Sequence, residues 1–308
     1  MGLVLYFLIE NDYICMKLQF YAFMKRLYPI ILAAMLLISC GGEKQIGIQL
    51  YSVHQDFADV EAMLEKIADA GYNTIETLSW QGDPCLGLSP EDYKSLCDRL
   101  GLSITSTHTL IPLQADDMES TMAAWRNHFS IMQRLGAKYS IIPGMNFGST
   151  LAEVKSTCDY CMKVGELAQE YGLKLGYHNH QGDFVKVEGV TLLDYVIQNT
   201  DPDKFFIQLD VCPMNMGGAD PMYYLKSYPD HIRVLHLKDE GVLGESGKID
   251  IEAIFKQFYS NGWSDFYAEY ELPFRIGDNE TENKSNLNKM WSGVKACADY
   301  LKNAKFVK

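Results

Sequence analysis

The chain has 308 residues, of which 47% are hydrophobic and 22% are charged, and its formal net charge is −13. This length and apolar content are enough for a sizeable core in one or two domains, and α/β barrels of about 250 residues fold as single domains. The negative charge argues against nucleic acid as a partner, because a nucleic-acid-binding protein needs a basic face.

The first 45 residues lack the pattern of a folded domain. A basic start at Met24-Lys-Arg26 precedes an apolar run over residues 27–38, and Leu37-Ile-Ser-Cys40 is followed by two glycines. A charged start, a short apolar run and small residues at its exit are typical of a secretory signal, whereas a membrane span needs about 20 apolar residues. Leu37-Ile-Ser-Cys40 resembles a bacterial lipobox, which implies cleavage before Cys40 and lipidation of that cysteine.

We therefore expect an exported bacterial lipoprotein, anchored to the membrane through Cys40 and facing the periplasm or the cell surface. Residues 24–39 would be the signal peptide, 40–45 a lipidated tether and 46–308 the folded domain. Residues 1–23 hold a second apolar run, and we interpret them as a non-native extension upstream of the true start. The alternatives are a plain cleaved signal or an uncleaved anchor.

From residue 46 onward, amphipathic helical segments end in glycine and a short apolar strand follows at once. Glycine is the expected left-handed residue at a helix C-terminus. Strands of this kind are predicted at 74–78, 103–108, 139–143, 174–178 and 266–270, and three more at 46–51, 205–210 and 232–237. Residues 284–304 are predicted to form the closing helix.

Eight strands alternating with helices are typical of a single-domain (β/α)8 TIM barrel. The alternative is an open doubly wound sheet. That fold would place a glycine-rich phosphate-binding turn after the first strand, and no such turn follows residues 46–51.

The cysteines outside the leader are scattered through the chain. Cys158 and Cys161 form a C-x-x-C pair, but the pair falls in a helical pattern and has no second pair to complete a structural zinc site. A disulfide between them is left open.

Chemistry in such a barrel sits at the carboxyl ends of the strands. The run Gly176-Tyr-His-Asn-His180 places two histidines, two residues apart, on one face at a strand end. Asp210, His236 and Glu269 each end another apolar strand. Imidazoles and carboxylates together suit one divalent ion such as Mn²⁺, Co²⁺, Mg²⁺, Fe²⁺ or Zn²⁺.

Other polar residues near strand ends are candidates for contact with a substrate. We expect Glu76 and His108 in a substrate pocket and Trp80 stacked on a sugar ring. Lys238 could stabilise charge on a substrate oxygen, and His180 could shuttle a proton. The alternatives are that Glu76 pairs with a basic group low in the barrel and that Lys238 pairs only with a neighbouring acidic residue, Asp239 or Glu240.

The segment from Ile46 to about Lys302 resembles the sugar phosphate isomerase/epimerase family, the xylose-isomerase-like barrels. The resemblance rests on short runs at the strand ends, which are Ile46-Gly-Ile-Gln-Leu-Tyr-Ser52, Gly176-Tyr-His-Asn-His180, Gln208-Leu-Asp210, Gly217-Gly-Ala-Asp-Pro221, Leu235-His-Leu-Lys-Asp239 and Ala268-Glu-Tyr270. It implies one divalent metal ion held by His178, Asp210, His236 and Glu269. It also implies proton abstraction next to a carbonyl, with the metal holding the resulting enediolate. The chemistry of the residues adds that Glu269 could serve as ligand and base together.

Two positions depart from the pattern of the ketose epimerases in this family. Those enzymes usually carry a glutamate where this chain has His178, and often a histidine where it has Pro213. Members with histidine at the fifth strand include dehydratases and enzymes that act on keto-sugars, so a symmetric two-glutamate epimerisation is not implied.

We therefore predict a metal-dependent isomerase or epimerase of a small carbohydrate, a sugar or keto-sugar. The alternatives are a lyase, either a dehydratase or a keto-glycoside-cleaving enzyme, and a non-catalytic sugar-binding lipoprotein. The net charge argues against a related apurinic endonuclease. A homo-oligomer is left open.

Overall fold

The computed structural model describes residues 44–114, 116–271 and 280–308, with the backbone alone for 280–282. The expected signal peptide, Cys40 and most of the expected tether lie outside the described residues. None of the helices in the described ranges is long and apolar enough to cross a membrane.

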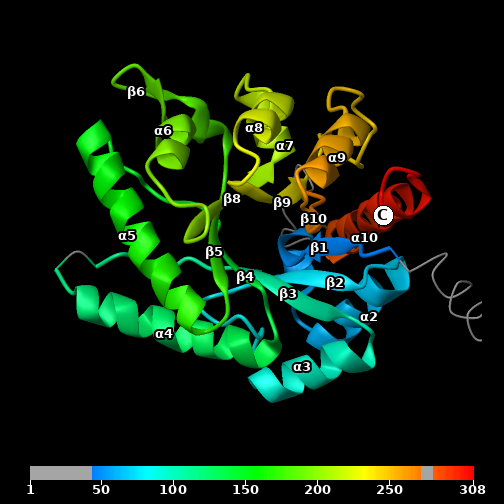
Figure 1. Cartoon of the computed structure of the whole chain (residues 1–308). Coiled ribbons are helices and arrows are strands. Elements are labelled where there is room, and N and C mark those ends of the chain that lie inside the picture. Colours follow the sequence, from blue (N-terminus) through cyan, green and yellow to red (C-terminus); the bar gives the residue numbers. More distant parts are fainter. Residues whose placement is uncertain (1–43, 115, 272–279) are drawn as a thin grey trace, which may run out of the picture. The chain divides into compact units, whose positions relative to one another are not determined.

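Eight parallel strands close into a barrel, in the order β1-β10-β9-β8-β5-β4-β3-β2, which confirms the predicted (β/α)8 fold (Figure 1). The barrel strands are β1 (Gly47–Gln49), β2 (Thr74–Leu78), β3 (Ser103–His108), β4 (Tyr139–Ile142), β5 (Lys174–His178), β8 (Phe205–Asp210), β9 (Ile232–Leu237) and β10 (Phe266–Ala268).

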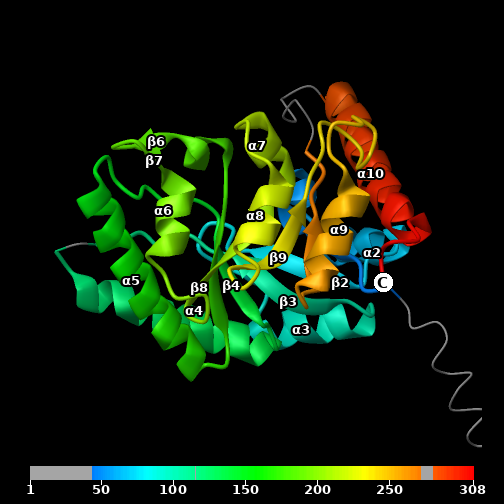
Figure 2. The same cartoon turned by 45° about the horizontal axis from the view of Figure 1, so that its top comes forward.

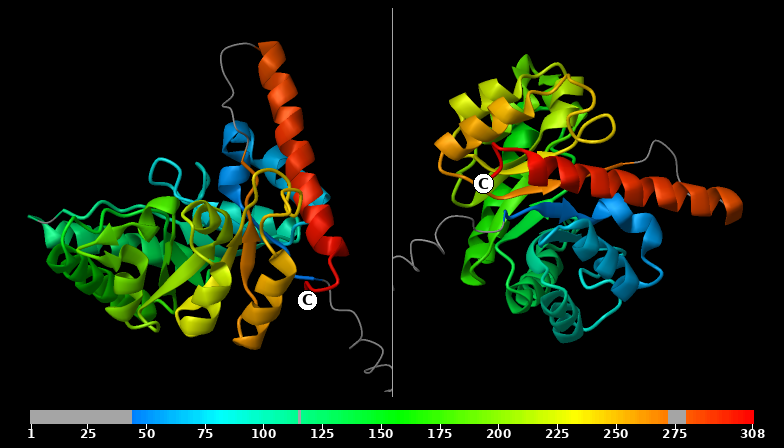
Figure 3. Two further views of the ribbon diagram at one scale, coloured as in Figure 1. Left: turned by 90° about the horizontal axis from the view of Figure 1, so that it is seen from above. Right: turned by 90° about the vertical axis from the view of Figure 1, so that its right-hand side faces the viewer.

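Helices surround the strands on the outside of the barrel (Figure 2). They are α2 (Val60–Ala70), α3 (Pro90–Arg99), α4 (Met118–Leu135), α5 (Leu151–Glu170), α6 (Leu192–Gln198), α7 (Val211–Met216), α8 (Pro221–Ser227), α9 (Ile251–Ser260) and α10 (Glu280–Asn303). Gly71 and Gly136 end α2 and α4 with φ of 99° and 80°, as the sequence pattern predicts. The long closing helix α10 packs against α2 and against the 3₁₀ helix η1 (Leu50–Asp56), and it is the long orange-to-red helix in both views of Figure 3.

The first and last barrel strands are shorter than predicted. The chain leaves β1 after Gln49, because the side-chain oxygen of Gln49 accepts the backbone N–H of Tyr51 and so turns the chain into η1. The short hairpin of β6 (Lys186–Val187) and β7 (Val190–Thr191) was not predicted, and two short helices, α7 and α8, form the connection between β8 and β9 where the alternating pattern predicted a helical segment. Cys158 and Cys161 are free and buried, so the disulfide that was left open is not formed.

Side chains fill the inside of the barrel in layers. A buried apolar cluster near the amino ends of the strands is made by Tyr139, Ile141, Phe206, Val234 and Tyr267. A buried polar layer lies above it, made by Gln49, Glu76, Ser106 and Gln208. The predicted site residues at the strand ends therefore rest on a packed and polar floor.

Candidate metal centre and cavity

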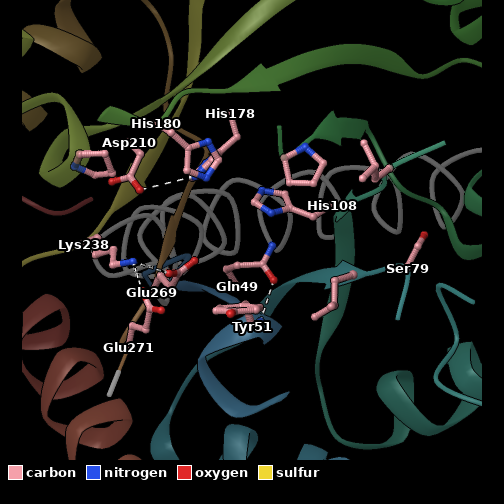
Figure 4. Close-up of a pocket in the computed structure, with 14 residues that line it drawn as sticks. Gln49, Tyr51, Ser79, His108, His178, His180, Asp210, Lys238, Glu269 and Glu271 are labelled. Carbon is pink, nitrogen blue, oxygen red and sulfur yellow. Dashed lines mark hydrogen bonds and ion pairs between the residues drawn. The ribbon is translucent and has the colours of Figure 1, made fainter. Parts of the chain in front are cut away.

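A cavity of about 430 Å³ opens at the carboxyl ends of the strands (Figure 4). Its lining residues are Gln49, Tyr51, Leu78, Ser79, His108, Leu110, Pro143, His178, His180, Asp210, Pro213, Lys238, Glu269 and Glu271. This is the end of the barrel at which TIM-barrel enzymes carry their active sites.

Three of the four expected metal ligands, His178, Asp210 and Glu269, line this cavity, and the fourth, His236, is fully buried between Asp210 and Glu269. Asp210 Oδ2 lies 3.6 Å from His178 Nε2 and 3.5 Å from His236 Nδ1. Glu269 Oε2 lies 3.4 Å from His236 Nε2. The other oxygen of Asp210, Oδ1, accepts the backbone N–H of Cys212, so this carboxylate caps α7 and faces the two histidines at the same time.

His236 tests whether this arrangement suits a metal ion. The side chain is fully buried, and neither ring nitrogen has a hydrogen-bond partner among the described residues. Unpaired buried polar atoms are rare in folded proteins. The separations of 3.4–3.6 Å are long for hydrogen bonds, but two ligands about 2.1 Å from one ion lie about 3.0–3.5 Å apart. Asp210 Oδ2, His178 Nε2 and His236 Nδ1 therefore fit one divalent ion. Glu269 faces Nε2, on the opposite edge of the His236 ring, so as placed it does not share that ion, which corrects the expected four-ligand set.

His108 lies closer to this centre than the sequence predicted. One nitrogen from each of His108, His178 and His236 lies within 4.8 Å of the others, so the three buried rings form a second possible ligand group. The Nε2 of His108 is already engaged, 2.8 Å from Gln208 Oε1 and 3.0 Å from Glu76 Oε1. His108 therefore has only Nδ1 to offer to an ion.

Burial and charge set the protonation of the centre. Burial lowers the pKa of His178 well below its ordinary value, and the nearby imidazoles of His236 and His108 add to the effect, so the ring is neutral at pH 7. Burial disfavours the charge on Glu269, but His236 and the Lys238 ammonium outweigh it and hold the pKa of Glu269 below its usual range. Glu269 is therefore a carboxylate at neutral pH.

Lys238 bridges two glutamates at the cavity wall. Its Nζ lies 3.0 Å from Glu269 Oε1 and also pairs with Glu271. Burial disfavours the ammonium, but the two carboxylates raise the pKa of Lys238 above its ordinary value, so it stays charged. The alternative pairing is wrong: Asp239 accepts backbone N–H groups of its own loop, and Glu240 pairs with a different lysine.

His180 faces the cavity next to His178, with the ring centroids 4.9 Å apart. Its backbone N–H donates to Asp183 Oδ2 at 2.6 Å, and the hydroxyl of Tyr177 donates to the same carboxylate at 2.9 Å. Asp183 and Tyr177 thus hold His180 in place. Asp183 was not among the residues expected from the sequence, although a carboxylate three residues after His180, in the turn that follows β5, is a recognisable turn signal.

Glu76 lies beneath the cavity and does not line it, which corrects the expectation that it contacts substrate. It is fully buried, and its two oxygens accept hydrogen bonds from Gln49 Nε2 at 2.8 Å, Ser106 Oγ at 2.6 Å and Gln208 Nε2 at 2.8 Å. Burial opposes its charge, but His108 and the hydroxyl of Ser106 lower the pKa of Glu76 to about 2. The alternative, a pairing low in the barrel, is closer to what is observed.

Trp80 sits at the rim and is not among the described residues that line the cavity. Its ring contacts His54 and Phe57, with centroids 5.8 Å and 5.6 Å away. From the same strand end, Leu78 and Ser79 reach the cavity instead. The stacking of Trp80 on a sugar ring stays a prediction.

Residues 64–290 match the family model of the xylose isomerase-like TIM barrel. The chain belongs to this family. It is similar to a solved structure of a sugar phosphate isomerase/epimerase from Parabacteroides distasonis, with 33% identity, a TM-score of 0.76, and coverage of 86% of this chain and 100% of the other.

Two other similarities are more remote. A D-psicose 3-epimerase from Clostridium cellulolyticum shares the fold at 16% identity and a TM-score of 0.62, over 84% of this chain and 98% of the other. The inosose dehydratase of Lacticaseibacillus casei is 26% identical over 165 residues, which is 49% of this chain and 55% of the relative. The chain thus spans about half the length of this curated relative. Membership of this family supports an enzyme.

Proposed function

We propose that the protein is a divalent-metal-dependent isomerase or epimerase that removes a proton next to the carbonyl of a sugar or keto-sugar. The observation that carries the proposal is the surroundings of Glu269. This buried carboxylate contacts His236 on one oxygen and Lys238 on the other, and it lines the cavity.

His178, Asp210 and His236 Nδ1 would hold the metal ion, with Glu269 beside them on the other edge of the His236 ring. A divalent ion bound there would polarise the substrate carbonyl and so make the adjacent proton more acidic.

The side chains around the cavity can supply a base, a group that stabilises negative charge and a proton donor. Glu269 is charged at neutral pH and can accept the proton from carbon. The Lys238 ammonium can stabilise negative charge that develops on a substrate oxygen. His180 follows β5 whereas Glu269 follows β10, with β8 and β9 between them in the barrel, so His180 can return a proton from a different direction.

A lyase is the second candidate, and two observations favour it. The curated relatives include inosose dehydratases, and the cavity carries His178 where the two-glutamate epimerases have a second carboxylate. Glu269 would begin the reaction in the same way. His180 or Lys238 would then donate a proton to a leaving hydroxyl or alkoxyl group instead of to carbon.

Incubation of the metal-loaded protein with keto-sugars in D₂O, followed by ¹H NMR, tests both candidates. Deuterium at a carbon next to the carbonyl with an isomeric product supports the isomerase or epimerase, and an unsaturated ketone supports the lyase. Glu269→Gln, which preserves size and hydrogen bonding, should abolish both. Absence of exchange into every ketone tested would contradict both and favour a sugar-binding protein.

We also propose, from the sequence alone, that Cys40 carries the lipid of an exported lipoprotein. Export would favour free sugars over phosphorylated ones. Incorporation of labelled palmitate into the wild-type protein but not into Cys40→Ser would support this, and equal labelling of both would overturn it.

A further inference from the structure

Gln208 connects two histidines of the cavity to the buried carboxylate below them. Its Oε1 lies 2.8 Å from His108 Nε2 and 3.0 Å from His178 Nδ1. Its Nε2 lies 2.8 Å from Glu76 Oε2. Gln208 is itself fully buried, so water cannot replace any of these partners at low cost.

The direction of every hydrogen bond in this network follows from Glu76. A carboxylate only accepts hydrogen bonds, so the NH₂ group of Gln208 must be the side of the amide that faces it. Gln49 Nε2 and Ser106 Oγ donate to the same carboxylate. In the opposite orientation, the carbonyl oxygen of Gln208 would face the carboxylate oxygens of Glu76, and the two acceptors would repel each other. The carbonyl oxygen of Gln208 therefore faces both histidines, and each must donate an N–H to it.

We propose that Glu76 and Gln208 are positioning residues that set the tautomers of two cavity histidines. His178 carries its proton on Nδ1 and its lone pair on Nε2, whereas His108 carries its proton on Nε2 and its lone pair on Nδ1. Neither positioning residue touches the substrate. Their effect on chemistry passes through the imidazoles above them.

The consequence is sharpest at His178. Its Nε2 lone pair lies 3.6 Å from Asp210 Oδ2, so two electron-rich atoms face each other in a buried place. Such a pair repels unless a cation lies between them, and a neutral imidazole with its other N–H held by a hydrogen bond is the form that binds metals. The polar layer thus prepares His178 as a ligand before any ion arrives. This last step rests on the proposed function, whereas the tautomers do not.

The tautomers can be read directly in the metal-free protein. In a protein labelled with ¹⁵N-histidine, NMR at a pH where the imidazoles are neutral distinguishes protonated from unprotonated ring nitrogens, and substitution of single histidines assigns the signals. The wild-type protein should show His178 protonated at Nδ1 and His108 at Nε2. A wild-type His178 protonated at Nε2 would overturn the proposal.

Glu76→Gln is the matching variant, because a glutamine there offers an NH₂ group toward Gln208. The Gln208 amide can then reverse and present its own NH₂ group to the histidines, so His178 should shift toward the Nε2–H tautomer. Titration calorimetry with Mn²⁺ or Zn²⁺ should show affinity about 10–100-fold weaker, the range typical of groups that orient metal ligands.

Ser106→Ala is the control, because it removes one donor to Glu76 and leaves the bond from Gln208 intact. Its tautomers should match the wild type. If Glu76→Gln does not fold, Gln208→Met removes the acceptor of His178 Nδ1 at similar size and should release the His178 tautomer, whereas His108 Nε2 keeps Glu76 Oε1 as an acceptor. A wild-type His178 tautomer in a folded Glu76→Gln or Gln208→Met would contradict the proposal. Failure of the wild type to bind metal would defeat the proposed function and leave the tautomer result standing.

Discussion

Lys238 donates a hydrogen bond from Nζ to Oε1 of Glu269 across 3.0 Å, within a wall of the cavity. The ammonium stabilises the carboxylate form of Glu269, which is the form a base requires. The same ammonium lies where charge on a substrate oxygen would develop under the proposed reaction. Lys238 therefore favours the ionised form of Glu269, and it also stabilises the negative charge that forms on the substrate oxygen when Glu269 removes a proton.

Replacing Lys238 with methionine should lower kcat about 10²-fold and leave metal affinity within a few-fold of the wild type. Loss of the ammonium also raises the pKa of Glu269, so the acidic limb of the pH–rate profile should move to higher pH. Glu271→Gln, which removes the other carboxylate from Lys238, is the control and should have the smaller effect. Wild-type turnover in Lys238→Met would exclude a part for this residue in the chemistry.

Replacing His236 with alanine should weaken binding of Mn²⁺ or Zn²⁺ more than about 100-fold, because the ion beside Asp210 and His178 loses the Nδ1 ligand. Metal at 100 times its Kd should stabilise the wild type by about 2.7 kcal/mol. The unfolding temperature with and without metal measures this directly. His231→Ala, which alters a histidine bonded to the Thr200 carbonyl, should keep the metal response; equal responses in both variants would count against the ligand assignment.

His128 should make the fold sensitive to acid independently of the cavity. It is buried on α4, bonds Ser140 and Thr109, and burial lowers its pKa to about 3. Since the unfolded chain has a histidine pKa of about 6.5, unfolding takes up a proton below that pH, and stability falls as pH decreases toward 3.

The expected loss from His128 between pH 7 and pH 5 is about 2 kcal/mol. Urea unfolding of the wild type and of His128→Gln at both pH values isolates this contribution. The variant should be less stable at pH 7 and lose about 2 kcal/mol less on acidification. Parallel losses in the two proteins would show that another group is responsible.

Gly165 should not tolerate alanine, although it lies inside α5. Glycine to alanine in a helix normally stabilises by about 0.5–1 kcal/mol. Here a Cβ would lie 1.9 Å from the backbone oxygen of Lys204, just before β8, and overpacking costs about 1–3 kcal/mol or more. Net destabilisation by at least about 1 kcal/mol is expected in chemical denaturation. Gly182→Ala, whose Cβ meets no described atom within 4 Å, is the control and should be near neutral.

The fold could be predicted from the sequence because its signals are local. A glycine with positive φ ends each of several helices, and its signal needs no knowledge of the rest of the chain. Asp210, His236 and Glu269 could be grouped for a related reason. Parallel strands of a closed barrel bring their carboxyl ends to one rim. A residue can therefore be assigned to this rim once the end of its own strand is recognised in the sequence.

Depth inside the barrel could not be predicted in this way. Glu76 and His108 were expected to share a pocket, but Glu76 lies level with Ser106, and the pairing of β2 with β3 shifts register at Ile75/Glu76. Gln208 lies level with His178 across the β5–β8 pairing, which brings its amide under both histidines. A strand's own residues determine which side chains point inward. Only the stagger between neighbouring strands, set when the barrel closes, decides which of them line the cavity and which become its floor.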